Sequence, residues 1–300
     1  MTEPRRIPDS GRPSPQQIAT TIALLADDAG VVQASARERL VLWGDAAVAQ
    51  LETATESDSM LVRLRSRAVL RAIEMRKDLR RFGRLQFERH GRGSAPVLLE
   101  GAVLLSRLVR TFVPGSDELG RKLRRHALAL KREFSGRSLP TCARLLAERL
   151  HDELGLAGVG SGDGEGEASV LELDHVLLHG VIARGTGIPV SLSLIYLLVA
   201  RWAGLSVSGV ALPDHFLVRL HGVRPVLVDP FHAGRTITKA DCSRYLRASG
   251  HEQVRHHLRD LDDREVLVHY LRALQRAASY RAVPEARRAL GRALTLLEPA

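Results

Sequence analysis

The sequence predicts an α+β protein in which a helical first half is followed by a mixed second half and a closing pair of helices. Apolar residues three and four positions apart run through residues 15–87 and 97–156, the spacing of amphipathic helices. After residue 170, three short runs, VSGVAL, HFLVRL and PVLVDPF, have the length and composition of β-strands. With 300 residues, 45% of them hydrophobic, the chain is long enough for one large domain or two modest ones.

The helical N-terminal region is expected to cover residues 16–90, after a disordered Pro-rich tail at 1–15. Within it, SARERLVLW at 35–43 recurs loosely as RSRAVLRAI at 65–73. This repetition resembles a HEAT-type helical repeat, in which paired helices share one apolar seam. A generic helical bundle is the alternative, and the segment HGRGSAP at 90–96 is a candidate boundary.

The remainder of the chain is expected to contain four parts. Residues 95–156 contain three amphipathic helices, and residues 157–169 form a Gly-rich acidic loop predicted to be flexible. Residues 170–250 contain the predicted strands and form the mixed core. Residues 260–298 predict a helical hairpin that resembles a TPR-type unit.

Three helices are predicted inside the mixed core. LELDHVLLHGVIARG at 171–185 is expected to form one continuous helix, and PVSLSLIYLLVARWAG at 189–204 a longer one that ends at Gly204. A third begins after Thr238, with Asp241 three residues later in the spacing of a capping box.

Composition limits the partners that the protein is expected to have. The formal net charge is +10, but all except four of the 44 basic residues are arginine, and they alternate with acidic residues along the chain. Only 4% of the residues are aromatic, which leaves little to stack on bases. A nucleic-acid partner is therefore not expected.

The location of the protein is expected to be cytoplasmic, without membrane association. The N-terminus lacks the apolar segment of a secretory signal. The longest apolar run, at 188–200, is shorter than the roughly 20 residues of a membrane span. Cys142 and Cys242, a hundred residues apart, suit a reducing compartment.

A candidate catalytic arrangement follows from the order of elements in the core. A helix after a Gly-containing turn, a strand that begins at His215 and a strand that carries Asp229 are the order in which a nucleophile, a base and an orienting acid are often assembled. The nucleophile is missing from the usual place. Ser191 is one candidate for it, and Cys142 and Cys242 are others, although all three also suit ordinary helix positions.

The same residues resemble a known family. The segments GIPVSL at 187–192, PDHFLVR at 213–219 and DPF at 229–231, followed by Gly234, resemble the SirB1 family of transglutaminase-like proteins. The resemblance covers about residues 95–298. It implies a papain-like core in which a small antiparallel sheet packs on a central helix.

The resemblance also shows how this sequence departs from the family. The superfamily begins the central helix with a catalytic cysteine, and counting back from Gly204 places Pro189 at that position. Family members have glycine before the histidine, where this chain has Asp214. They also have an Asn-Ser-aromatic-Leu segment where this chain has residues 175–178.

The absent cysteine favours a non-catalytic interaction protein that binds an unidentified protein or peptide. The alternative is a hydrolase or acyltransferase with Ser191 as nucleophile, His215 as base and Asp229 as orienter. A third reading gives the cleft a structural role alone.

No cofactor and no metal ion is expected. His175 and His179, four residues apart on a predicted helix, have a spacing that zinc uses, but a third ligand is not evident. The cluster of His251, His256 and His257 is expected to face solvent.

Overall fold

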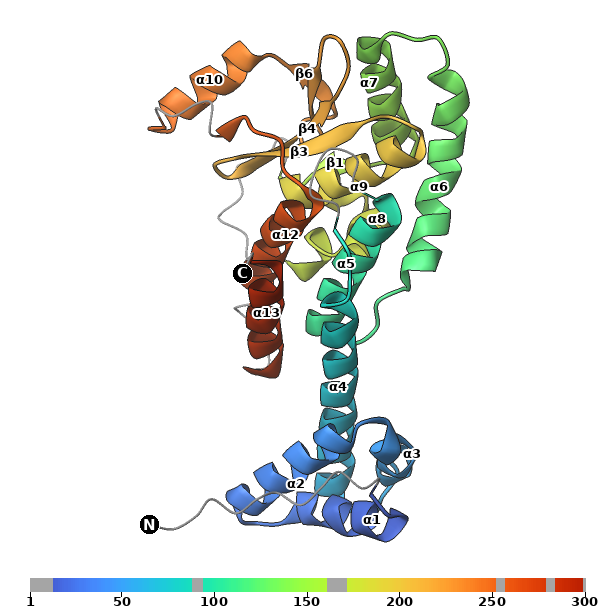
Figure 1. Ribbon diagram of the computed structural model, residues 1–300, viewed down its shortest axis with the longest axis vertical. Helices are drawn as coiled ribbons and strands as arrows, with labels where there is room; N and C mark the ends of the chain where they lie inside the picture. Colours follow the sequence, from blue (N-terminus) through green and yellow to red (C-terminus); the bar gives the residue numbers. More distant parts are fainter. Residues whose placement is uncertain (1–12, 88–93, 161–171, 252–256, 279–283, 299–300) are drawn as a thin grey trace. The chain divides into compact units, whose positions relative to one another are not determined.

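The computed structural model describes residues 13–87, 94–160, 172–251, 257–278 and 284–298. Their contacts divide the chain into two compact units, one up to Asp78 and the other from Leu79 onward. The predicted α+β class is confirmed, because helices are accompanied by a small antiparallel sheet (Figure 1).

The first unit is helical. It contains α1 (Pro15–Ala23), a 3₁₀ turn (Leu24–Ala26), α2 (Gly30–Trp43), α3 (Asp45–Ala54) and the start of α4 (Met60–Phe82). Ser14 begins α1 with a capping box that it forms with Gln17. The helices pack around one apolar cluster that includes Leu25, Leu40 and Leu51, all without solvent exposure. The division between the units falls inside α4 and not at the boundary expected at 90–96. Residues 88–93, which overlap that boundary, lie outside the described residues.

The second unit is built around one apolar helix, α9. Its helices are α5 (Ala95–Val109), α6 (Ser116–Glu133), α7 (Leu139–Glu148) with a π turn (Arg149–Glu153), α8 (Leu178–Arg184), α9 (Pro189–Trp202), α10 (Lys239–Ala248), α12 (Asp263–Ala278) and α13 (Pro284–Leu297). Every residue of α9 from Val190 to Ala200 is buried. Helices α5, α6 and α12 and the sheet surround it (Figure 1), which accounts for its apolar composition on all sides.

The sheet has four antiparallel strands in sequence order, β3 (Val207–Leu212), β4 (His215–Leu220), β5 (Val226–Asp229) and β6 (Arg235–Ile237). The first three are the predicted strands, whereas β6 was not predicted. Strands β3 and β4 pack on α9. A two-residue loop joins β3 to β4, and its second residue, Asp214, has a φ of 53°. Glycine adopts this left-handed conformation at little cost, and glycine is the residue that the SirB1 resemblance expects there.

Two sequence predictions need correction. The loop predicted at 157–169 begins later, because Ala157–Gly158 form β1, which pairs in parallel with β2 (Thr186–Gly187). From residue 161 the loop lies outside the described residues.

The continuous helix predicted at 171–185 is divided into a 3₁₀ turn (Leu173–His175) and α8. The His175 carbonyl accepts a hydrogen bond from the Ile188 amide instead of an amide within a helix. A hydrogen bond to a residue outside the helix has therefore replaced the helical hydrogen bond of this carbonyl.

The helices that close the second unit follow the predictions. Thr238 and Asp241 form the expected capping box at the start of α10, and α12 and α13 pack together as a hairpin. Among the residues that the structure describes, no helix combines the length and the apolarity needed to cross a membrane.

Candidate functional site

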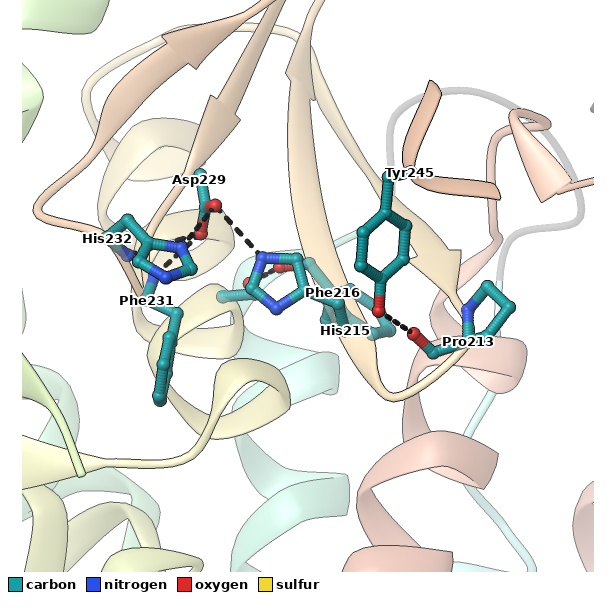
Figure 2. A network of polar contacts seen from close by, with 8 residues as sticks. Pro213, His215, Phe216, Asp229, Phe231, His232 and Tyr245 are labelled. Atoms are coloured by element: carbon teal, nitrogen blue, oxygen red, sulfur yellow. Dashed lines mark hydrogen bonds and ion pairs between the residues drawn. The ribbon is translucent and has the colours of Figure 1, made fainter. Parts of the chain in front are cut away.

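The site begins with His215 and Asp229, which the structure brings together. His215 is the first residue of β4 and Asp229 the last of β5, and because these neighbouring strands are antiparallel, the two residues lie at the same edge of the sheet. The His215 Nε2 atom is 3.0 Å from Asp229 Oδ2 (Figure 2). An acid that orients an imidazole makes a contact of this length, although the angles at His215 Nε2 do not meet those of a hydrogen bond.

The Asp229 carboxylate is held on both of its oxygens. The residue is 1% exposed, and its Oδ1 atom accepts hydrogen bonds from the backbone amides of Phe231 at 3.1 Å and His232 at 3.2 Å. Burial alone raises the pKa of Asp229, but the close contacts and charges of His215 and His232 lower this pKa below its ordinary value. The carboxylate is therefore ionised and fixed in orientation.

His232 is a third member of the site that sequence reasoning missed. Its Nδ1 atom lies 2.7 Å from Asp229 Oδ2, the oxygen that also contacts His215. His232 lies in a tight turn that follows Asp229. In this turn Ala233 and Gly234 both have positive φ, and the Gly234 amide donates a hydrogen bond to the Asp229 carbonyl. The feature of the sequence that could have indicated His232 is its position three residues after Asp229, in Asp229-Pro230-Phe231-His232.

Ser191 is the third residue of α9 and lies away from solvent. It is fully buried, and its hydroxyl donates a 2.7 Å hydrogen bond to the Val176 carbonyl. Ser193 is likewise buried and donates to the Phe216 carbonyl at 3.1 Å. Pro189 is the first residue of α9. Both hydroxyls thus satisfy backbone carbonyls inside the fold.

The two cysteines are buried in helices. Cys142 is 3% exposed in α7, and Cys242 is 2% exposed in α10, where it packs in an apolar cluster with Leu217. Burial raises the pKa of both thiols. A buried thiol with a raised pKa is a poor nucleophile.

A pocket of about 730 Å³ opens beside the histidines. Its lining combines apolar and charged side chains, and α10 and β4 contribute both kinds. The apolar residues are Leu212, Leu217, Ile237, Cys242 and Ala248, and the polar ones are His215, Asp229, His232, Arg235, Thr236, Asp241, Arg244 and Tyr245. The Tyr245 hydroxyl donates to the Pro213 carbonyl at 2.8 Å, which links α10 to the β3–β4 loop (Figure 2). Ser191 is not part of this lining.

The histidine pairs considered from sequence are arranged differently. His175 ends the 3₁₀ turn and His179 lies in α8, so the two do not share one helix face, contrary to the expectation. The His251 and His257 rings are 4.9 Å apart, and His256 lies outside the described residues.

Comparison with known proteins places the chain in a superfamily. The model of the transglutaminase-like superfamily matches residues 117–272. F-box only protein 21 from Mus musculus is 36% identical over 77 residues, which cover 23% of this chain and 12% of that protein. The UPF0162 protein from Xylella fastidiosa (strain 9a5c) is 46% identical over 61 residues, covering 20% of this chain and 22% of that protein.

Both likenesses are local, since the chain spans only these small fractions of its curated relatives. No solved structure matches the chain significantly. The family match covers more than half of the sequence and includes α9, the sheet, His215 and Asp229. On this basis the chain belongs to the transglutaminase-like superfamily.

Proposed function

We propose that this chain is a non-catalytic transglutaminase-like protein that binds a protein or peptide in the pocket beside His215. The observation that carries the proposal is the position of the Ser191 hydroxyl. This hydroxyl is fully buried and donates a hydrogen bond to a backbone carbonyl, whereas His215 lines an open pocket. A serine nucleophile must reach both its base and the substrate. A pocket of this kind without an accessible nucleophile suits binding better than acyl transfer.

The lining of the pocket indicates what kind of peptide it would accept. The apolar lining residues suit one hydrophobic side chain, and Arg235 and Arg244 in the same lining suit a nearby carboxylate. Arg244 also lies 3.7 Å from Asp241, so a bound carboxylate would compete with this exposed ion pair. The partner we propose therefore presents an apolar residue next to an acidic residue or a C-terminal carboxylate.

The proposal is tested with peptides selected from a random library on the purified full chain. The binding of a selected peptide is measured by fluorescence anisotropy for wild type, Arg244→Glu and Arg247→Glu. Both arginines are exposed on α10, but only Arg244 lines the pocket. We expect about tenfold weaker binding for Arg244→Glu and unchanged binding for the control. Equal effects of the two variants, or no selectable peptide, would contradict the proposal.

A second candidate function is a hydrolase or acyltransferase that uses Ser191, His215 and Asp229. The observation that favours it is the 3.0 Å contact between His215 and Asp229, since it is the contact that a general base requires. To act, the Ser191 hydroxyl would have to leave the Val176 carbonyl. Cleavage or transamidation of peptides by purified protein, lost in both Ser191→Ala and His215→Ala, would support this candidate over the first.

The finer family membership is also a proposal. We infer that the chain is a SirB1-type protein, supported by the GIPVSL, PDHFLVR and DPF segments. A HEAT-like character for residues 16–90 and a TPR-like character for 260–298 are supported by helical pairs in both regions. We further propose a cytoplasmic location, supported by two unpaired, buried cysteines.

A further inference from the structure

We propose that His215, Asp229 and His232 form a binding site for a divalent transition-metal ion, with Zn²⁺ as the ion that fits best. His215 Nε2 and His232 Nδ1 lie 3.0 and 2.7 Å from the same oxygen, Asp229 Oδ2 (Figure 2). One ligand atom from each residue lies within 4.8 Å of the other two. Two imidazoles and one carboxylate are a donor set that zinc and other first-row metals use.

The spacing of the three donor atoms is close to what a small ion needs. Neighbouring ligand atoms around a tetrahedral zinc ion are about 3.4 Å apart, given bonds of about 2.1 Å. The contacts of His232 and His215 to Asp229 Oδ2, at 2.7 and 3.0 Å, are shorter than this by about 0.7 and 0.4 Å. A small rotation of the exposed His232 ring would open the space, because this side chain is 47% exposed.

The carboxylate is already oriented for ligation by its surroundings. Its Oδ1 atom is occupied by the amides of Phe231 and His232, which directs Oδ2 toward the two imidazoles. The Gly234 amide holds the same turn through the Asp229 carbonyl at 2.8 Å. Outer hydrogen bonds of this kind fix the ligands of established metal sites and raise affinity.

The site is also accessible and leaves one coordination position open. All three residues line the pocket, so an ion has an entry path. Three protein ligands leave the fourth position of a tetrahedral ion facing the pocket, as in catalytic rather than structural zinc sites. Arg235 and Arg244 in the same lining favour an anionic fourth ligand. The inference does not depend on the proposed peptide binding, because it concerns only the three donors and their ion.

The test is a calorimetric titration of Zn²⁺ into the untagged, chelator-treated full chain, with Mg²⁺ titrated separately. We expect one Zn²⁺ per chain and no binding of Mg²⁺, which prefers oxygen ligands. Binding to His232→Asn should be at least about tenfold weaker. His221→Asn is the matched control, because His221 is a half-exposed histidine at the end of the same sheet, outside the three-residue site.

The exposure of His232 keeps the test informative. His232→Asn is expected to retain the fold because this side chain is 47% exposed, and circular dichroism checks that it does. Co²⁺ gives a second readout, since absorption bands typical of four-coordinate cobalt should appear with wild type and not with His232→Asn. Zn²⁺ binding that is equal in wild type and His232→Asn, equally weakened in His221→Asn, or absent from wild type would overturn the proposal.

Discussion

The Nε2 atom of His215 lies 3.0 Å from Oδ2 of Asp229 although a proline, and not a cysteine, begins the buried helix α9. The contact depends on the sheet, because the start of β4 and the end of β5 meet at one edge. It does not depend on the residue at the start of α9. The pairing of His215 with Asp229 therefore does not require a nucleophilic side chain at the start of α9.

The stability contributed by the Asp229 charge should depend on pH. The pKa of Asp229 is lowered in the folded protein because the contacts of His215 and His232 outweigh the effect of burial. Asp229→Asn should therefore destabilise the protein at pH 6 by about 1–3 kcal/mol. The unfolded chain binds the proton more readily, so this difference should shrink as the pH falls below about 4. Urea denaturation of both proteins between pH 3 and pH 6 measures it, and a difference that grows toward low pH would contradict the assignment.

Gly234 should tolerate no side chain. Its φ is +68°, and an added Cβ would collide with the Tyr196 hydroxyl and lie 2.5 Å from the Ala147 Cβ. Gly136 is a matched control, since its φ is +70° but nothing lies within 4 Å of an added Cβ. Both alanine variants carry the cost of placing a residue with a Cβ at positive φ. The collision occurs only in Gly234→Ala, so this variant should be less stable than Gly136→Ala by about 1–3 kcal/mol. Denaturant midpoints compare them, and equal losses would mean that the turn shifts to make room.

A thiol placed at the start of α9 should be unusually acidic. Pro189 is the first helical residue and is partly exposed, and a thiolate is stabilised by the amides at a helix N-terminus. The thiol of Pro189→Cys should therefore have a pKa below the ordinary value of about 8.5. The rate of alkylation by iodoacetamide as a function of pH measures this pKa. Wild type supplies the background, because both native thiols are buried with raised pKa values.

The protein with aspartate at position 214 should be less stable than the glycine variant and more stable than a variant with a β-branched residue. Its φ of 53° lies in the left-handed region, which costs about 1–2 kcal/mol for residues with an ordinary Cβ. Asp214→Val should lower the free energy of unfolding by about that amount, whereas Asp214→Gly should leave it unchanged or raise it slightly. Urea denaturation of the three proteins gives the order. A valine variant as stable as wild type would show that the β3–β4 loop changes its conformation.

Regular elements were predictable where the pattern was long. The strands at 207–212 and 215–220 and the helix at 189–202 are largely apolar runs and match the structure. Strand β1 and strand β2 have only two residues each, too few for any periodicity. The break before α8 escaped prediction because the Asp174 carbonyl lies 2.5 Å from where a Gly180 Cβ would stand, a close approach that no local pattern encodes.

The candidate site was predictable only in part. His215 and Asp229 stand out because the first begins an apolar strand and the second ends one, whereas His232 lies in a turn and belongs to no periodic pattern. Its position depends on the turn at 229–232, in which Asp229 Oδ1 accepts hydrogen bonds from the amides of Phe231 and His232. Ser191 could be placed on α9 from sequence, but the direction of its hydroxyl depends on the Val176 carbonyl, fifteen residues earlier.

The hydrogen bond from Tyr245 to the Pro213 carbonyl has a consequence for the size of any molecule that enters the pocket. Helix α10 carries one wall, and this bond is a direct polar link between that wall and the β3–β4 loop. Tyr245 is 42% exposed, so breaking the bond costs little, on the order of 1 kcal/mol. A molecule large enough to displace the Tyr245 side chain, which lines the pocket, must break this bond.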